Sequence, residues 1–182
     1  FLAGISAAFS LGRLVETEGK DAALLRVFKR TLLLYLLGVF YYGGLAGRLG
    51  ADGQWSGRLE DIRLLGVLQR IALCYGAAGF LFVICSRRML WVALGFCLIG
   101  YWALMTFVPV PGIGAGSFAE GRNLANWLDA RYLPWRKWDG THDPEGLLST
   151  LPAIGTCLMG VLSGLVLKDR ETAPSSKSVV LA

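Results

Sequence analysis

Long apolar runs alternate with polar segments along this chain. Four of these runs cover residues 31–47, 64–85, 89–108 and 147–167. A helix needs roughly 20 apolar residues to cross the hydrocarbon core of a bilayer, and even the shortest run approaches that length. The pattern therefore predicts four membrane-spanning helices.

The two ends of the chain carry shorter apolar stretches. Residues 1–12 are too few to span a bilayer, and they begin without a methionine or a basic segment, which excludes a signal peptide. Residues 178–182 turn apolar again after the polar segment 168–177. We therefore expect a piece of a longer protein whose first run is the second half of a span. The expected fold is an all-α, polytopic transmembrane bundle that forms one domain over residues 1–182.

The composition is typical of an integral membrane protein. Hydrophobic residues make up 54% of the chain, charged residues make up only 17%, and the mean hydropathy is +0.53. The net charge of +5 does not indicate nucleic-acid binding, because the basic residues flank the spans in loops. The four cysteines lie inside predicted spans without paired spacing, so we expect neither a disulfide framework nor a metal site.

The distribution of Lys and Arg predicts the orientation in the membrane. One side of the four spans carries ten of these residues: Arg13, Lys20, Arg26, Lys29, Arg30, Arg87, Arg88, Lys168, Arg170 and Lys177. The other side has fewer, and four of them lie in the long loop 111–146. Lys and Arg in long loops have less influence on the orientation of a membrane protein. We therefore expect the first side to be cytoplasmic and loop 111–146 to lie outside, as in a bacterial inner-membrane protein.

The outer loop 111–146 is longer than a simple connection requires. Within it, residues 123–133 place Leu124, Trp127 and Leu128 on one face of a helix. We expect a short helix in the outer interface, with aromatic rings at the level of the lipid headgroups. An aromatic belt without any role in ligand binding remains an equal alternative.

Two carboxylates stand at the start of the last apolar run, in the sequence Asp143-Pro144-Glu145-Gly146. Asp is a good N-cap and Pro suits the first helical position, so this sequence predicts a helix that begins here. Both carboxylates would then meet the positive end of the helix dipole at the outer face. Helix capping and a role in ligand binding explain the two carboxylates equally well.

Gln69 and Arg70 lie inside the second predicted span, where a charged side chain costs roughly 2.5 to 3.5 kcal/mol at the bilayer centre. Arg63 precedes Arg70 by seven residues, so we expect both to project from one helix face. Together they would hold an anionic group or bind carboxylates from another helix. The alternative is structural, with Arg70 reaching the interface or pairing with Asp143, Glu145 or Asp61.

Other features of the spans concern packing more than chemistry. Gly43 with Gly47, and Gly160 with Gly164, form pairs of small residues that allow helices to approach closely. Pro152 is expected to kink or open the last span. The single histidine, His142, is a weak candidate for a general base, because it neighbours Asp143 in the chain and adjacent residues rarely point at a common atom.

Four segments of the chain resemble the heparan-alpha-glucosaminide N-acetyltransferase family and its bacterial relatives, in the same order and with the same spacing. The two main ones are LLGVLQRI at 64–71 and DPEGLLSTLP at 143–152. They are supported by FLAGIS at 1–6, similar to the end of the family's second span, and by NLANWLDAR at 123–131, similar to its long outer loop.

The resemblance implies a bundle of about eleven helices that passes an acetyl group from cytoplasmic acetyl-CoA to an amino sugar or glycan on the outer side. The family's catalytic histidine would lie upstream of residue 1, and His142 does not match it. Further implied partners are the lipid bilayer and a small-molecule or glycan acceptor, while a homo-oligomer stays open. The residues that would line the outer part of the site are Gln69, Arg70, Asp143 and Glu145, with Arg63 and Asn123 as further candidates for substrate binding.

Two other functions fit the same residues. A transporter would bind an ion or anionic substrate at Arg70 and the Asp143/Glu145 pair beside a broken helix, although the spans show no internal repeat. A membrane scaffold would use the same charges only to pair with one another.

Overall fold

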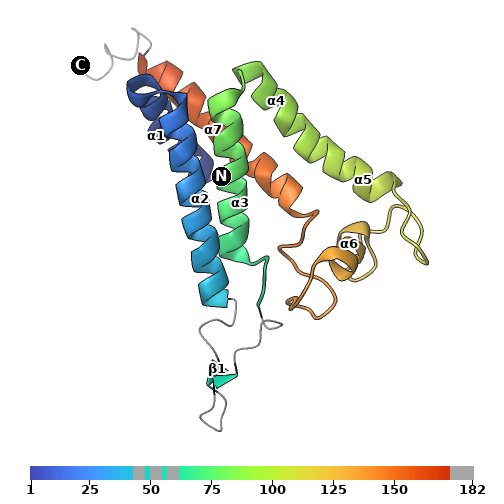
Figure 1. Ribbon diagram of the computed structural model, residues 1–182. Helices are drawn as coiled ribbons and strands as arrows, with labels where there is room; N and C mark the ends of the chain where they lie inside the picture. The colour runs from blue at the N-terminus through green and yellow to red at the C-terminus, as the bar shows by residue number, and fades with distance from the viewer. Residues whose placement is uncertain (43–47, 50–54, 57–61, 173–182) are drawn as a thin grey trace, which may run out of the picture.

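A computed structural model describes residues 1–42, 48–49, 55–56 and 62–172, and these residues form an all-α structure with six helices (Figure 1). The helices are α1 (Leu2–Glu18), α2 (Lys20–Tyr42), α3 (Val67–Ile84), a continuous helix made of α4 (Arg87–Gly95), a π-helical turn (Phe96–Gly100) and α5 (Tyr101–Phe107), then α6 (Leu124–Tyr132) and α7 (Thr150–Thr172). Strands β1 (Arg48–Leu49) and β2 (Trp55–Ser56) pair in an antiparallel hairpin.

Three of the helices are long and apolar enough to cross a membrane. They cover Val67–Ile84, Arg87–Phe107 and Thr150–Arg170, each with a mean hydropathy of 1.8. These helices correspond to three of the four apolar runs in the sequence. A multi-pass arrangement is therefore consistent with the structure.

The first apolar run is only part of a helix with a different character. α2 begins at Lys20 instead of residue 31, and its first half carries Arg26, Lys29 and Arg30. Because it is unfavourable to insert charged side chains into hydrocarbon, α2 is not among the helices that are apolar enough to cross a membrane. The end of the predicted span, including Gly43 and Gly47, lies outside the described residues. The expected half span 1–12 likewise extends further, to Glu18.

Helix α1 packs closely against α7 through glycines. A Cβ atom placed on Gly160 would collide with the backbone carbonyl of Phe1, and one placed on Gly4 would collide with the carbonyl of Cys157. Gly164 faces Ala8 in the same way, one turn further along. The small-residue pair Gly160 and Gly164 therefore serves helix packing, as the sequence predicts.

The remaining helices build three further contacts. α2 packs along α3, and their shared core with α1 contains Leu11, Val27 and Tyr75. α3 and α4 pack against α7 in a second core that includes Leu90 and Leu158.

α5 extends away from the group formed by α1, α2, α3 and α7, and α6 packs beneath α5 (Figure 1). This third contact buries Met105 and Leu124.

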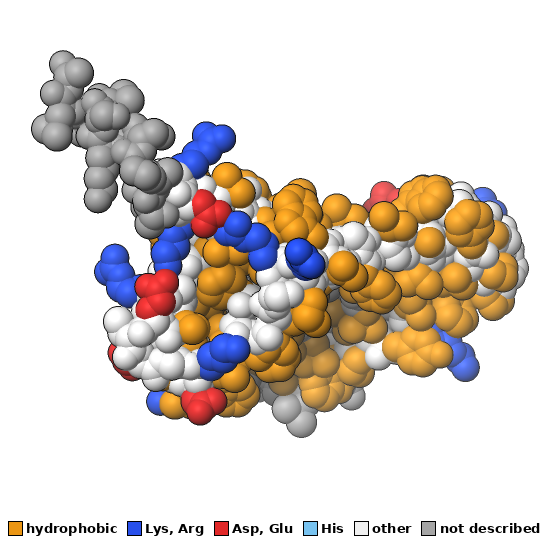
Figure 2. Space-filling model, turned by 90° about the horizontal axis from the view of Figure 1, so that it is seen from above, with side chains coloured by type: hydrophobic (Ala, Val, Ile, Leu, Met, Phe, Trp, Pro, Cys, Tyr) orange, Lys and Arg blue, Asp and Glu red, His pale blue; other side chains and the backbone are white. Residues whose placement is uncertain are grey.

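Charged side chains gather at the end of the molecule where α1 turns into α2 and α3 turns into α4. Figure 2 looks down on this end, with Lys, Arg, Asp and Glu side chains over the compact helices and hydrophobic side chains over α4 and α5. Two ion pairs connect α7 to its neighbours there: Lys168 Nζ lies 2.6 Å from Glu16, and Arg87 Nη1 lies 2.7 Å from Asp169. All four cysteines are free.

Candidate functional site

The segment 143–149 does not belong to α7. The helix begins at Thr150, and Asp143-Pro144-Glu145-Gly146 forms a turn in which the Gly146 amide donates to the Asp143 carbonyl at 2.9 Å. The prediction that Asp143 caps the last helix is therefore wrong. The physical reason is that the carboxylate and the amides of this segment find stronger partners elsewhere in the fold.

Arg63 provides the partner of both carboxylates. Its Nε donates to Asp143 Oδ2 at 2.7 Å, and its Nη2 donates to Asp143 Oδ1 and to Glu145 Oε2 at 2.5 Å each. Arg63 is 6% exposed and Asp143 is 2% exposed. A planar guanidinium that meets a carboxylate in this two-bonded way is fixed in orientation as well as in position. We call Arg63, Asp143 and Glu145 the outer charge cluster.

This arrangement corrects the expectation that Arg63 and Arg70 share one helix face. α3 begins at Val67, so Arg63 lies in the non-helical segment before it. The helix therefore does not fix the direction of the Arg63 side chain, which reaches the carboxylates of Asp143 and Glu145. It lies far from them in sequence, which is why spacing along the chain did not reveal the pair.

The contact between Arg63 and Asp143 also shifts the pKa values of these two groups. Burial by itself would raise the pKa of Asp143, but the hydrogen bonds from Arg63 and from the Glu145 amide, with the charge of Arg63, hold that pKa below its ordinary value. The hydrogen bond to Asp143 raises the pKa of Arg63 in spite of burial. Both groups of this pair are therefore charged at neutral pH.

Trp138 covers the cluster. Its ring lies 5.1 Å from the Arg63 guanidinium carbon, a cation–π contact, and its backbone amide donates to Asp143 Oδ2 at 3.3 Å. Trp138 is one of the aromatic residues of the outer loop, and in the fold its ring shields the arginine from one side.

Asp129, on α6, is a residue that sequence reasoning missed. It is 1% exposed, and its carboxylate accepts from the Leu147 amide at 2.9 Å and the Asp143 amide at 3.5 Å. A Cβ on Gly146 would collide with this carboxylate. Burial raises the pKa of Asp129 although the two backbone hydrogen bonds oppose the rise. Its position four residues after Ala125, on the buried face of α6, is the signal that was available in the sequence.

Arg70, in the first turn of α3, binds the same segment. Its Nη1 donates to the Pro144 carbonyl at 3.2 Å and its Nη2 donates to the Ser149 carbonyl at 2.7 Å. The alternative expected from sequence, an ion pair with Asp143 or Glu145, is not formed, because Arg63 occupies those carboxylates. Asp61 lies outside the described residues.

Gln69 holds Arg63 in place. Its side chain is fully buried, and its Nε2 donates to the Arg63 carbonyl at 3.1 Å. Its Oε1 has no hydrogen-bond partner among the described residues. Gly38 and Gly66 make room for it, since a Cβ on either would collide with the amide.

A cavity of about 380 Å³ lies beside Arg70, between α1, α3 and α7. Its walls are mostly apolar and include Ile71, Cys74, Ala153 and Cys157. Pro152 also lines it, but this proline is the third residue of α7. The first turn of a helix does not use its N–H groups, so the expected disruption in the middle of a span does not apply.

Asn123 and His142 stand apart from the outer charge cluster. Asn123 caps α6, accepting from the Asn126 amide at 2.9 Å, which confirms the short predicted helix but uses the side chain structurally. His142 Nδ1 lies 3.1 Å from Thr141 Oγ1, and its Nε2 lies 3.6 Å from Asp139.

The fold also groups His142 with two acids in a way that sequence spacing did not indicate. Side-chain ligand atoms of Glu120, Asp139 and His142 all lie within 4.8 Å of one another. Within the part of the chain that the structure describes, these three residues are the group that could hold a metal ion. Glu120 is 85% exposed, as in an ordinary solvated surface group.

Compared with known proteins, the chain matches no family model and no curated protein.

Proposed function

We propose that the protein is a membrane-embedded acyltransferase that moves an acetyl group from cytoplasmic acetyl-CoA to an amino sugar or glycan acceptor on the outer side. The observation that carries this proposal is the buried cluster of Arg63, Asp143 and Glu145 next to a mostly apolar cavity with Arg70 at its wall. The resemblance of residues 64–71 and 143–152 to the acetyltransferase family supports the same function.

The reaction makes defined demands on the site. The acceptor amine attacks the thioester carbonyl, a C–N bond forms, the C–S bond breaks, and the amine proton passes to a base while coenzyme A leaves as the thiol. Catalysis requires that base and hydrogen-bond donors for the negative charge on the carbonyl oxygen.

The described residues are suited to two of these roles. Glu145 is the carboxylate of the cluster whose side chain keeps some exposure, 19%, so it is the group that would orient or deprotonate an acceptor amine. Arg70 has five N–H donors and hydrogen-bonds only two backbone carbonyls among the described residues, while it lines the cavity. Its remaining donors would hold the oxygen of an acetyl group. Asp143 would position Arg63 and, through it, Glu145.

Acetyl transfer from radiolabelled acetyl-CoA to glucosamine and a panel of amino sugars tests this function. The complete protein is reconstituted in liposomes, and Glu145→Gln is compared with Arg122→Gln, an exposed cation of the same outer loop. We expect product with the unaltered protein and with Arg122→Gln. We expect transfer to fall by about 10² to 10⁴ in Glu145→Gln, the range for loss of a general base.

Two outcomes would count against the proposal. Undiminished transfer by Glu145→Gln at normal abundance would remove Glu145 from the mechanism. A protein that acetylates no acceptor and is not stabilised by acetyl-CoA against thermal unfolding would exclude the acyltransferase. In that case, flux of an anionic solute that depends on Arg70 would favour the transporter that the sequence also allows.

A further inference from the structure

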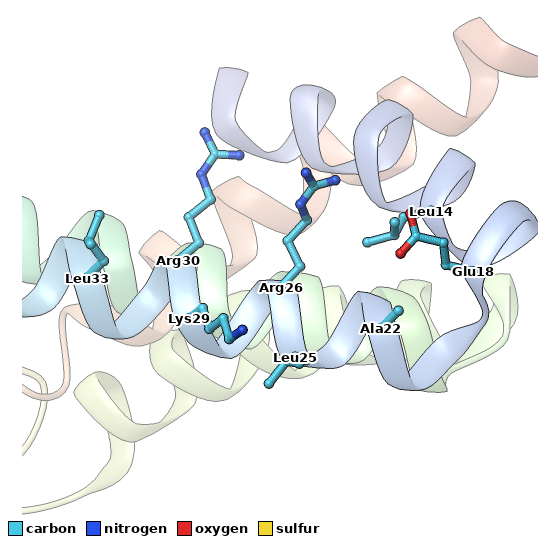
Figure 3. A pocket seen from close by; sticks show the side chains of 8 residues that line it. All are labelled: Leu14, Glu18, Ala22, Leu25, Arg26, Lys29, Arg30 and Leu33. Atoms are coloured by element: carbon cyan, nitrogen blue, oxygen red, sulfur yellow. The ribbon is translucent and has the colours of Figure 1, made fainter.

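A groove of about 630 Å³ lies between α1 and α2 at the charged end of the molecule (Figure 3). One face of α2 supplies most of its lining, including Leu25, Arg26, Lys29, Arg30 and Leu33, which recur at helical spacing. In Figure 3, Arg26 and Arg30 extend from α2 in the same direction, on the side of α1. No part of the proposed acyl-transfer site belongs to this groove.

Three cations and one acid line the groove, so its charge is positive. Arg26, Lys29 and Arg30 are exposed, and none of them forms an ion pair within the part of the chain that the structure describes. Glu18 is the acid that lines the groove with them. Cations four residues apart on a helix repel one another, so Arg26 and Arg30 destabilise α2 unless an anion lies between them.

An apolar surface continues from the basic residues along α2. Leu33, Leu36, Leu37 and Phe40 are all exposed and follow Arg30 toward the other end of the helix. A ligand that matches both parts has an anionic head and a long hydrocarbon tail. This is the chemistry of an acidic phospholipid, whose phosphate sits at the level where a helix changes from charged to apolar residues.

We propose that the groove between α1 and α2 binds the phosphate group of an acidic phospholipid through Arg26, Lys29 and Arg30, with the acyl chains along the exposed leucines of α2. Tyr75 supports this geometry, because the guanidinium of Arg30 lies 5.4 Å from the centre of its ring and is oriented by that contact. Each cation is expected to contribute about fivefold to the affinity, the usual magnitude for Lys or Arg at an anionic membrane surface.

The test measures lipid binding by the complete protein in detergent. Native mass spectrometry and thermal unfolding are recorded with phosphatidylglycerol and, separately, with phosphatidylcholine. The variant Arg26→Gln/Lys29→Gln/Arg30→Gln is compared with Arg88→Gln, which removes an exposed cation from the start of α4 at the same end of the molecule. Inorganic phosphate and ADP without lipid form two further arms.

We expect phosphatidylglycerol to bind and stabilise the protein at least tenfold more effectively than phosphatidylcholine. The triple variant is expected to lose this preference while Arg88→Gln keeps it. Because all three side chains are exposed, the triple variant is expected to fold; if it does not, Lys29→Gln alone is expected to weaken phosphatidylglycerol binding about fivefold.

Three results would overturn the proposal. The first is equal binding of both lipids, and the second is unchanged phosphatidylglycerol binding by the variants. The third is stabilisation by phosphate or ADP that depends on the same three residues and exceeds the effect of the lipid, which would make the groove a site for a soluble phosphate compound.

Discussion

At the scale of single residues, the outer charge cluster explains how a span-flanking arginine and two carboxylates are accommodated. Arg63 satisfies Asp143 and Glu145 at once, while Gln69 donates to its carbonyl and the ring of Trp138 lies over its guanidinium. Burying charges is unfavourable unless each is paired and hydrogen-bonded, and here each is. The cluster is therefore sensitive to the loss of any one member.

Removal of the arginine is expected to be strongly destabilising. Arg63→Gln leaves Asp143 buried without its counter-charge, and breaking a buried pair from one side costs about 3 to 5 kcal/mol. Thermal unfolding in detergent measures the change, with the exposed Arg122→Gln as the matched control. A midpoint for Arg63→Gln equal to that of the control would show that the pair contributes no stability.

The same pair predicts a dependence on acidity. Because the folded protein lowers the pKa of Asp143, its stabilising contribution is fully present above the ordinary carboxyl pKa of about 4 and is lost as the pH falls through the lower folded value. Asp143→Asn should thus differ from the unaltered protein at pH 7 and approach it below pH 4. Unfolding midpoints recorded from pH 7 to 3 test this, and a gap that stays constant over the range contradicts it.

At the scale of elements, two features determine where the site lies. These are the close contact between α1 and α7 and the start of α7 at Thr150 instead of Asp143. α7 does not begin at Asp143, because the backbone before Thr150 is hydrogen-bonded to side chains of other helices. Asp129 on α6 accepts from the amides of Asp143 and Leu147. Arg70 on α3 donates to the carbonyls of Pro144 and Ser149. The irregular segment is thus held by two other helices.

The crossing of α1 and α7 depends on glycine. Gly160→Ala puts a methyl group against the Phe1 carbonyl, which is backbone and has no rotamer with which to yield, so we expect a loss of about 1 to 3 kcal/mol. Gly95→Ala on α4 is the control: nothing lies within 4 Å of the added carbon, and the higher helix propensity of Ala favours a gain of up to about 1 kcal/mol. Unfolding in detergent compares the two, and equal effects would refute the close contact.

At the scale of the whole molecule, many Lys and Arg side chains lie at one end (Figure 2), and α6 lies toward the other (Figure 1). The outer charge cluster is close to α6, because the Asp143 amide donates to Asp129 on that helix. Three helices between these ends are long and apolar enough to cross a membrane. We propose that the basic end faces the cytoplasm, as the positive-inside rule predicts. In the proposed function, acetyl-CoA and the acceptor would then approach from opposite ends.

Labelling of introduced cysteines tests this orientation. In a Cys85→Ser background, Glu120→Cys and Arg88→Cys place thiols at exposed positions near opposite ends, while the other three native cysteines are buried. A membrane-impermeant maleimide added to intact cells is expected to label position 120 only. Position 88 should react after permeabilisation, and the reverse pattern would invert the topology.

The sequence by itself determined three of the four expected apolar helices and the short helix 124–132, because hydrophobic periodicity and length are local properties. It also singled out Arg63, Arg70, Asp143 and Glu145, since charged residues next to long apolar runs are rare enough to stand out.

Only the tertiary structure decided which of these charges meet. Arg63 pairs with the carboxylates, Arg70 binds backbone carbonyls, and Asp129 joins the site from α6, across separations that no local pattern encodes. The start of α7 was misjudged for the same reason. Local capping preferences are worth about 1 kcal/mol, whereas leaving one partner of a buried ion pair without the other costs about 3 to 5 kcal/mol.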